Sequence, residues 1–258
     1  MAGLARRARG RPRLRARLPR HHGPALADRG AHALRRAARP LVHRRGGRRR
    51  PARRGESLLV DGAEVTGRIV FGPIPERGGR TAAFGDTLIE IAKRGGYDLL
   101  RPRHPGHPTR AGYRGTPAYV PSESWVIEGR FVPYDAPVEV TVGSVAEGLQ
   151  HVYAAPGEIE FRHDGDVHRL IAFNGFRPGS LLVLFTDATS GVTTYPANRS
   201  LSVAAPDADG RVVLDFTRAV NLPCAYTEFA TCPLPPAGNR LPFPVEAGER
   251  LPHERTSR

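Results

Sequence analysis

Several features are scarce or missing in this chain of 258 residues, and each absence excludes a class of protein. The only two cysteines are Cys224 and Cys232, which excludes a small fold held together by several disulfides. No run of about 18 apolar residues occurs, so the sequence contains no candidate for a membrane-spanning helix. No long window has the periodicity of an amphipathic helix, which argues against a helical fold.

The first 55 residues lack most of the residue types that build a core. They contain no Phe, Trp, Tyr, Lys or Ser, and a single acidic residue, Asp28, against 19 Arg. Such a segment cannot bury enough apolar surface to offset the entropy of ordering it, so residues 1–55 are predicted to be a disordered basic arm. Three interpretations stay open: an arm that binds nucleic acid, a solvated tail, or upstream sequence read from a start codon assigned too early. The abundance of Arg, Ala, Gly and Pro, all encoded by GC-rich codons, favours the last.

The formal net charge of +14 is therefore uneven along the chain. The arm contributes +18, which leaves 20 basic and 24 acidic side chains, a net charge of −4, in the other 203 residues. A mildly acidic body argues against nucleic-acid binding by the body itself. Because no apolar segment typical of a secretory signal follows the first arginines, we expect a cytoplasmic protein without a membrane partner.

From residue 56 onward, short runs of alternating apolar and polar residues are separated by turn signals. Asp61-Gly62 and Asp164-Gly165 are dipeptides typical of tight hairpins. Leu181–Phe185 is apolar throughout, which indicates a strand buried on both faces. The predicted fold is all-β or β-dominated, with antiparallel hairpins in a sandwich-like body. Short helices are considered only at Val145–Gln150 and Thr217–Asn221.

One β-rich domain is predicted over residues 56–252, with a tail at 253–258. Residues 215–243 within it have no strand-like alternation, five prolines and both cysteines. Their aromatic residues predict an ordered Pro/Cys-rich loop laid over the body. Cys224 and Cys232 are compatible with a disulfide, a metal site completed by distant ligands, or two thiols. A reducing compartment argues against the disulfide, and no neighbouring basic residue activates either thiol, so buried unreactive thiols are favoured over a catalytic one.

Two histidine pairs and one polar loop are further site candidates. His104 and His107 lie in a Pro-rich loop and lack a third ligand nearby in sequence, so a polar loop is predicted there. His163 and His168 enclose Asp164 and Asp166, but carboxylates beside glycine are also typical of a tight surface turn, so a hairpin is predicted and no metal site. Thr186–Arg199 follows the most apolar strand and combines a carboxylate, hydroxyls, a phenol and a guanidinium. It is interpreted either as a hairpin whose polar groups satisfy the backbone or as a polar binding edge.

Three stretches carry a resemblance to a known family. They are GTPAYVP at 115–121, FTDATSGVTTY at 185–195 and NLPCAYTEFATCPLPPAGNRLP at 221–242. Together they resemble domain-of-unknown-function family 1684, found largely in bacteria and some archaea, over about residues 56–252. The resemblance implies that the polar residues of these stretches belong to one pattern, but it implies no activity. We therefore expect the 186–199 and 221–240 loops to meet in space.

The leading functional hypothesis is a small-molecule-binding protein or enzyme with a polar pocket between those two loops. Asp187 would be the acid/base residue and Cys224 the nucleophile. Arg199 would hold an anionic or carbonyl group of the ligand. The alternatives are a non-catalytic protein-binding or scaffold module and nucleic-acid binding through the arm. No cofactor is predicted, and the remaining ligand-binding candidates are Thr189, Tyr195, Asn221, Tyr226 and Asn239.

Overall fold

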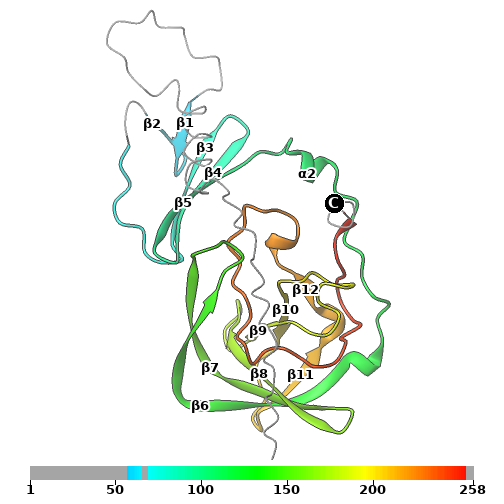
Figure 1. Ribbon diagram of the computed structural model, residues 1–258. Helices are drawn as coiled ribbons and strands as arrows, with labels where there is room; N and C mark the ends of the chain where they lie inside the picture. Colours follow the sequence, from blue (N-terminus) through cyan, green and yellow to red (C-terminus); the bar gives the residue numbers. More distant parts are fainter. Residues whose placement is uncertain (1–56, 66–68, 254–258) are drawn as a thin grey trace, which may run out of the picture.

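The computed structural model describes residues 57–65 and 69–253, and their regular structure is almost entirely antiparallel β-sheet (Figure 1). The β-dominated fold predicted from the sequence is therefore confirmed. The predicted basic arm at 1–55 and residues 254–258 of the predicted tail lie outside the described residues. Within the described part of the chain, no helix has the length and apolar character needed to cross a membrane.

The first sheet contains five strands in the order β2-β1-β3-β4-β5. The hairpins form where the sequence supplies left-handed turn residues, as at Asp61 and Gly62, with φ of 50° and 83°. Three buried side chains, Val60, Ala82 and Ile89, form its small core. The strands are β1 (Leu58–Val60), β2 (Ala63–Val65), β3 (Gly79–Phe84), β4 (Thr87–Arg94) and β5 (Tyr97–Arg103).

The second sheet contains seven strands in the order β11-β6-β7-β8-β9-β10-β12. Its two longest strands, β6 and β7, are longer than the segments of alternating apolar and polar residues in the sequence. Strand β6 is long because it continues through Pro133 and Pro137. The pairing of β6 with β7 shifts register between Pro133 and Val138, which accommodates residues that cannot donate to the ladder. The strands are β6 (Val126–Gly143), β7 (Gln150–His163), β8 (Asp166–Asn174), β9 (Leu181–Phe185), β10 (Arg199–Val203), β11 (Arg211–Asp215) and β12 (Val220–Asn221).

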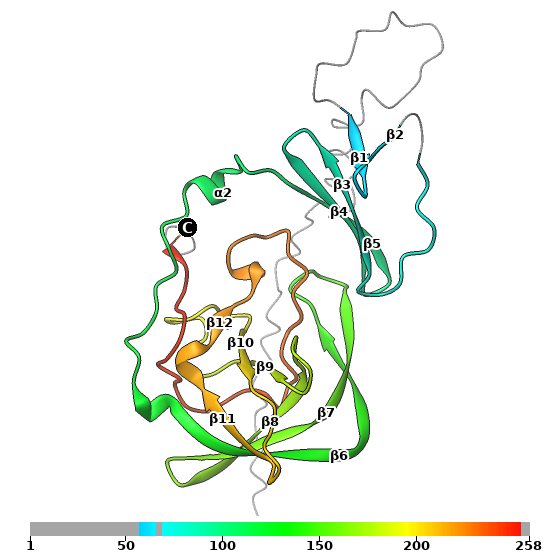
Figure 2. The same cartoon turned by 180° about the vertical axis from the view of Figure 1, so that it is seen from behind.

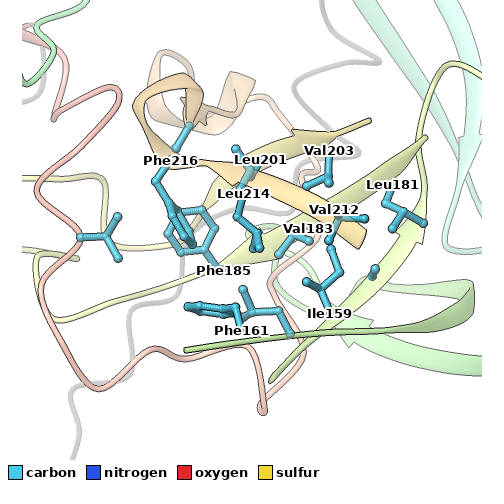
Figure 3. Close-up of a cluster of buried hydrophobic side chains, with 14 of the residues drawn as sticks. Ile159, Phe161, Leu181, Val183, Phe185, Leu201, Val203, Val212, Leu214 and Phe216 are labelled. Atoms are coloured by element: carbon cyan, nitrogen blue, oxygen red, sulfur yellow. The ribbon is translucent and has the colours of Figure 1, made fainter. Parts of the chain in front are cut away.

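The main core lies inside the curve of this second sheet. Strands β10 and β11 contact each other although they are not neighbours in the hydrogen-bonded order, so the sheet curls around its apolar side chains. Figure 3 shows Phe161, Phe185 and Phe216 converging from different elements. The ring centres of Phe185 and Phe216 lie 5.5 Å apart in an edge-to-face arrangement. Leu184 packs on the opposite face of β9 in a separate cluster, which confirms that this strand is buried on both faces.

Long connections wrap the second sheet. After β5 the chain passes through α2 (Pro108–Ala111) and η1 (Glu123–Trp125) along the outside of the body to reach β6 (Figure 2). The C-terminal segment packs beside this connection, where Tyr119 N donates to Gly248 O at 2.9 Å and Arg250 N donates to Pro117 O at 2.8 Å. The ordered Pro/Cys-rich loop expected from the sequence is present. Within residues 215–243 it contains η2 (Phe216–Arg218), the two-residue strand β12 and η3 (Pro223–Ala225).

The short-helix predictions are largely wrong. Residues 145–150 form a turn that leads into β7, and Thr217–Asn221 overlaps only the end of η2 before β12 begins. Backbone pairing explains both outcomes. Val145 N donates to Cys232 O at 3.0 Å, so long-range pairing with the C-terminal loop replaces a local helix.

The two sheets meet through the start of β7. A Cβ atom added at Gly95, in the β4–β5 turn, would lie 2.5 Å from the carbonyl oxygen of Gln150, so only glycine fits there. The Arg77 guanidinium lies 3.8 Å from the centre of the Tyr153 ring, and its Nη2 donates to Val152 O at 3.4 Å. These contacts bring residues of β5 close to the Pro/Cys-rich loop.

Candidate functional site

Asp187 lies directly after β9 and is buried in a complete set of hydrogen bonds. Its Oδ1 accepts from Thr189 N at 2.7 Å, from Thr189 Oγ1 at 2.6 Å and from Val245 N at 3.2 Å. Its Oδ2 accepts from Arg199 Nη2 at 2.8 Å. Sequence reasoning proposed Asp187 as an acid/base residue. A general base must reach a proton of the substrate, and this carboxylate has no solvent-facing oxygen.

Arg199, at the start of β10, is the partner of Asp187, and the side chains of the pair are 1% and 0% exposed, respectively. Its Nη2 also donates to Val245 O at 2.9 Å, and its Nη1 donates to Ala247 O. The guanidinium therefore fastens the C-terminal segment onto the second sheet. Buried ion pairs of this kind are tolerated because further hydrogen bonds offset the desolvation of both charges. The geometry favours structural roles for Asp187, Thr189 and Arg199 over the ligand-binding roles suggested by their sequence.

Asn239 is also fully buried and closes a gap between strands. Strands β8 and β9 pair only near Phe173 and Asn174, so the neighbouring backbone groups need other partners. Asn239 Oδ1 accepts from Ile171 N at 2.8 Å, and Asn239 Nδ2 donates to Ile171 O at 2.9 Å and to Leu184 O at 2.8 Å. Its amide replaces part of the missing ladder, which is a structural use of a residue that sequence reasoning assigned to a ligand.

Asn221 and Tyr226 lie together at the edge of the C-terminal segment. Asn221 Nδ2 donates to Arg250 O at 2.8 Å, while the Tyr226 hydroxyl pairs with Thr116 Oγ1 at 2.8 Å and donates to Glu249 Oε2 at 3.3 Å. Burial raises the pKa of Tyr226. These contacts join the segment between α2 and η1 to the C-terminal segment. Asn221 and Tyr226 take no part in the hydrogen bonds around Asp187.

Cys224 and Cys232 form a different kind of pair. Both are buried, and they share a small apolar cluster with Ala230 and Tyr195. The two side chains interact with each other, and Tyr195 hydrogen-bonds with Cys224. The Cys224 thiol donates to Asn198 Oδ1, with Sγ 4.0 Å from that oxygen. Tyr195 and Asn198 belong to the 186–199 loop, so the two loops meet at the thiols, as expected from the sequence.

This interaction makes the ionisation of the two thiols unequal. Hydrogen bonding with Cys232, together with burial, raises the pKa of Cys224 far above that of an ordinary thiol. Hydrogen bonding with Cys224 lowers the pKa of Cys232, and the positive charge of Arg101 acts in the same direction, while burial opposes both. Cys232 is therefore the member of the pair that is easier to ionise.

The surroundings of Cys232 come from both sheets. Arg101 lies on β5 of the first sheet, 3.5 Å from Glu90 Oε1, and its buried Nε has no hydrogen-bond partner. On β7, Tyr153 interacts electrostatically with Cys232, and His151 Nε2 pairs with Thr231 O at 2.8 Å. Sequence reasoning missed Cys232, Arg101, His151 and Tyr153 as site residues. The shared loop was the only available signal for Cys232, and nothing local pointed to the other three.

The alternative of a protein-binding or scaffold module would be favoured by an exposed ridge over Phe229–Pro236. In this stretch only Phe229 is strongly exposed, while Ala230, Cys232 and Pro236 are buried. In the part of the chain that the structure describes, no three His, Cys, Asp or Glu side chains are grouped so as to hold a metal ion. The nucleic-acid-binding arm lies outside the described residues.

Fold and site together define a β-rich protein whose two sheets meet beside a buried pair of thiols. The family model described as "Protein of unknown function (DUF1684)" matches residues 111–250, and the chain belongs to this family. The match confirms the resemblance seen in the sequence and includes the whole second sheet. That the family domain begins as early as residue 56 stays a prediction.

Two further comparisons concern solved structures and curated proteins. The solution NMR structure of an uncharacterized protein from Haloarcula marismortui is 29% identical, covers 57% of this chain and 82% of its own, and aligns with a TM-score of 0.47. No curated protein matches this chain.

Proposed function

We propose that this chain is a small-molecule-binding protein or enzyme that acts through the thiol of Cys232. The observation that carries the proposal is the burial of Cys232 with Cys224 in one small cluster, where the interaction with Cys224 and the positive charge of Arg101 both favour the Cys232 thiolate. A thiolate is the nucleophilic form of cysteine, and a neighbouring donor and cation both favour it. This moves the nucleophile predicted at Cys224 to its partner.

The surroundings of the sulfur limit the substrate class. Cys232 is 8% exposed and Cys224 is 2% exposed, so only a small molecule reaches the pair without a rearrangement of the loop. A nucleophilic sulfur reacts with small electrophiles and with oxidants such as hydroperoxides. The positive charge of Arg101, which acts on Cys232, favours a substrate with a partial negative charge. The expected ligand is therefore a small polar electrophile or oxidant.

The proposal is tested by alkylation of the full chain with iodoacetamide, followed by peptide mass spectrometry. At pH 7, Cys232 is expected to react in the folded protein, whereas Cys224 reacts only after denaturation. Cys224→Ser and Cys232→Ser are matched control variants, and circular dichroism checks that both fold. Modification of Cys224 before Cys232, or no modification of either thiol until the protein unfolds, would contradict the proposal.

A further inference from the structure

We infer that Cys224 and Cys232 form a reversible dithiol–disulfide couple in which Cys232 takes the oxidant and Cys224 resolves it. This inference rests on the proposed function, because it requires Cys232 to be the nucleophile. The two side chains are eight positions apart in the sequence, yet they lie in one small buried cluster. They also interact with each other there.

The surrounding backbone holds this arrangement from both sides. The Cys224 side is fixed by η3, where Ala225 N donates to Leu222 O at 2.9 Å and Tyr226 N to Pro223 O at 3.0 Å. The Cys232 side is fixed to the β6–β7 turn, since Cys232 O accepts from Val145 N at 3.0 Å and from Ser144 Oγ at 3.2 Å. The intervening residues 225–231 form the loop that a disulfide would close, so no distant part of the chain has to move.

The chemistry balances with a hydroperoxide as the oxidant. The Cys232 thiolate attacks the terminal peroxide oxygen, an S–O bond forms, the O–O bond breaks, and an alkoxide or hydroxide leaves and takes up a proton. Cys224 then attacks the sulfenic sulfur of Cys232. The S–S bond forms as the S–O bond breaks, and hydroxide leaves as water with the proton of Cys224. Two electrons pass from the thiols to the peroxide, and a small dithiol returns them when it reduces the disulfide.

The environment of the two sulfurs favours Cys232 as the attacking thiol and Cys224 as the resolving thiol. Cys232 interacts electrostatically with Arg101 and hydrogen-bonds with Cys224, and both interactions stabilise its thiolate. The raised pKa of Cys224 keeps this thiol protonated, and it is released for attack once Cys232 has been oxidised and no longer carries negative charge. Tyr195, which hydrogen-bonds with Cys224, is in place to stabilise the resolving sulfur as it ionises.

The test treats the reduced full chain with hydrogen peroxide in the presence and absence of dimedone, which traps sulfenic acids. The wild type is expected to lose two hydrogen atoms in intact mass, to give a 224–232 disulfide peptide, and to recover on addition of dithiothreitol. Cys224→Ser, which removes the resolving thiol, is expected to give about tenfold more dimedone adduct at Cys232 than the wild type. Cys232→Ser is expected to give neither adduct nor disulfide.

The outcomes separate the inference from the function on which it rests. If Cys232 reacts with iodoacetamide and dimedone but no intramolecular disulfide forms, the inference is overturned and the proposed function stands. If neither thiol of the folded protein reacts with any reagent, both fail. Disulfides that form only between chains also overturn the inference. Circular dichroism of the two serine variants shows whether loss of reaction reflects loss of fold.

Discussion

Two buried pairs of polar side chains lie in neighbouring parts of this protein, and they differ in how fully their bonding capacity is used. Asp187 and Arg199 bond to each other and to backbone groups at Thr189, Val245 and Ala247. The thiols of Cys224 and Cys232 interact mainly with each other, with Tyr195 and with Asn198, which are weaker partners than the charged groups of the first pair. The Nε atoms of Arg101 and Arg199 both lack a hydrogen-bond partner, so the contrast lies between the Asp187 carboxylate and the two thiols. A group that is already saturated with strong partners holds the fold. A group that can still form hydrogen bonds or ion pairs is the better candidate for chemistry, even when, like a thiol, it is less polar.

The largest effect is expected at the saturated pair. Arg199→Leu leaves the Asp187 carboxylate buried without its cation, so the free energy of unfolding is expected to fall by about 3–5 kcal/mol. Urea denaturation followed by circular dichroism measures the change. Arg169→Leu is the control, because its ion pair with Glu160 is on the surface and no measurable loss is expected. A fall below about 1 kcal/mol for Arg199→Leu would return this residue to the ligand-binding candidates.

A smaller loss is expected at Asn239. Asn239→Ala leaves Ile171 N and the carbonyl oxygens of Ile171 and Leu184 without this partner, and each unsatisfied buried group costs about 1–3 kcal/mol before water relaxes into the site. We expect a total loss of about 2–3 kcal/mol in the same denaturation experiment. If Asn239 instead held a ligand, the variant would keep its stability and lose only binding.

The thiol pair predicts a specific pH dependence of stability. Since the folded-state pKa of Cys232 is lowered, its contribution grows as pH rises from that value toward the ordinary thiol value of about 8.5. Since the folded-state pKa of Cys224 is raised, its contribution is lost above the ordinary value, where the unfolded chain ionises. Denaturation at several pH values from 6 to 10 should show the rise and the fall in wild type. Cys232→Ser should lose the rise, and an unchanged profile would contradict the unequal ionisation of the two thiols.

The smallest effect concerns the contact between the sheets. Arg101→Gln removes the cation beside Cys232, so the apparent pKa of Cys232 is expected to rise and its alkylation at pH 7 to slow by a few-fold. Arg103→Gln is a matched control, because Arg103 is on the same strand and also pairs with Glu90. Equal slowing in both variants would mean that loss of a Glu90 partner, rather than the charge beside the sulfur, is responsible.

Much of the fold was predictable because strand alternation and hairpin turns are local. Leu181–Phe185 was predicted with the boundaries that it has in the structure. Strand β3 was missed because GRTAAF has few large apolar side chains, and its pairing with β1 and β4 supplies what its composition does not. The full length of β6 was missed because its prolines indicate breaks, whereas pairing with β7 on both sides of a register shift keeps the strand continuous.

The candidate site was predictable only in part, and for a related reason. The sequence placed chemistry-bearing residues in two loops and indicated that these loops meet, but residue type alone does not reveal whether a polar group is already satisfied. Asp187 and Arg199 looked like ligand-binding groups because carboxylates and guanidiniums have that chemistry. Three of the backbone groups that bond to them belong to Val245 and Ala247, about 50 positions away.

By itself, the sequence determined the β-rich fold class, the separation of a basic N-terminal stretch from a mildly acidic body, membership of the family, and the two loops that hold the polar residues. These depend on composition and on patterns between near neighbours in the chain. Only the tertiary structure decided which of the two cysteines is easier to ionise. Cys232 has no basic neighbour in sequence, and the cation beside it, Arg101, is brought there by contact between two sheets. Because electrostatic and hydrogen-bonding effects on a pKa act through space over a few ångströms, the chain had to fold before this difference existed.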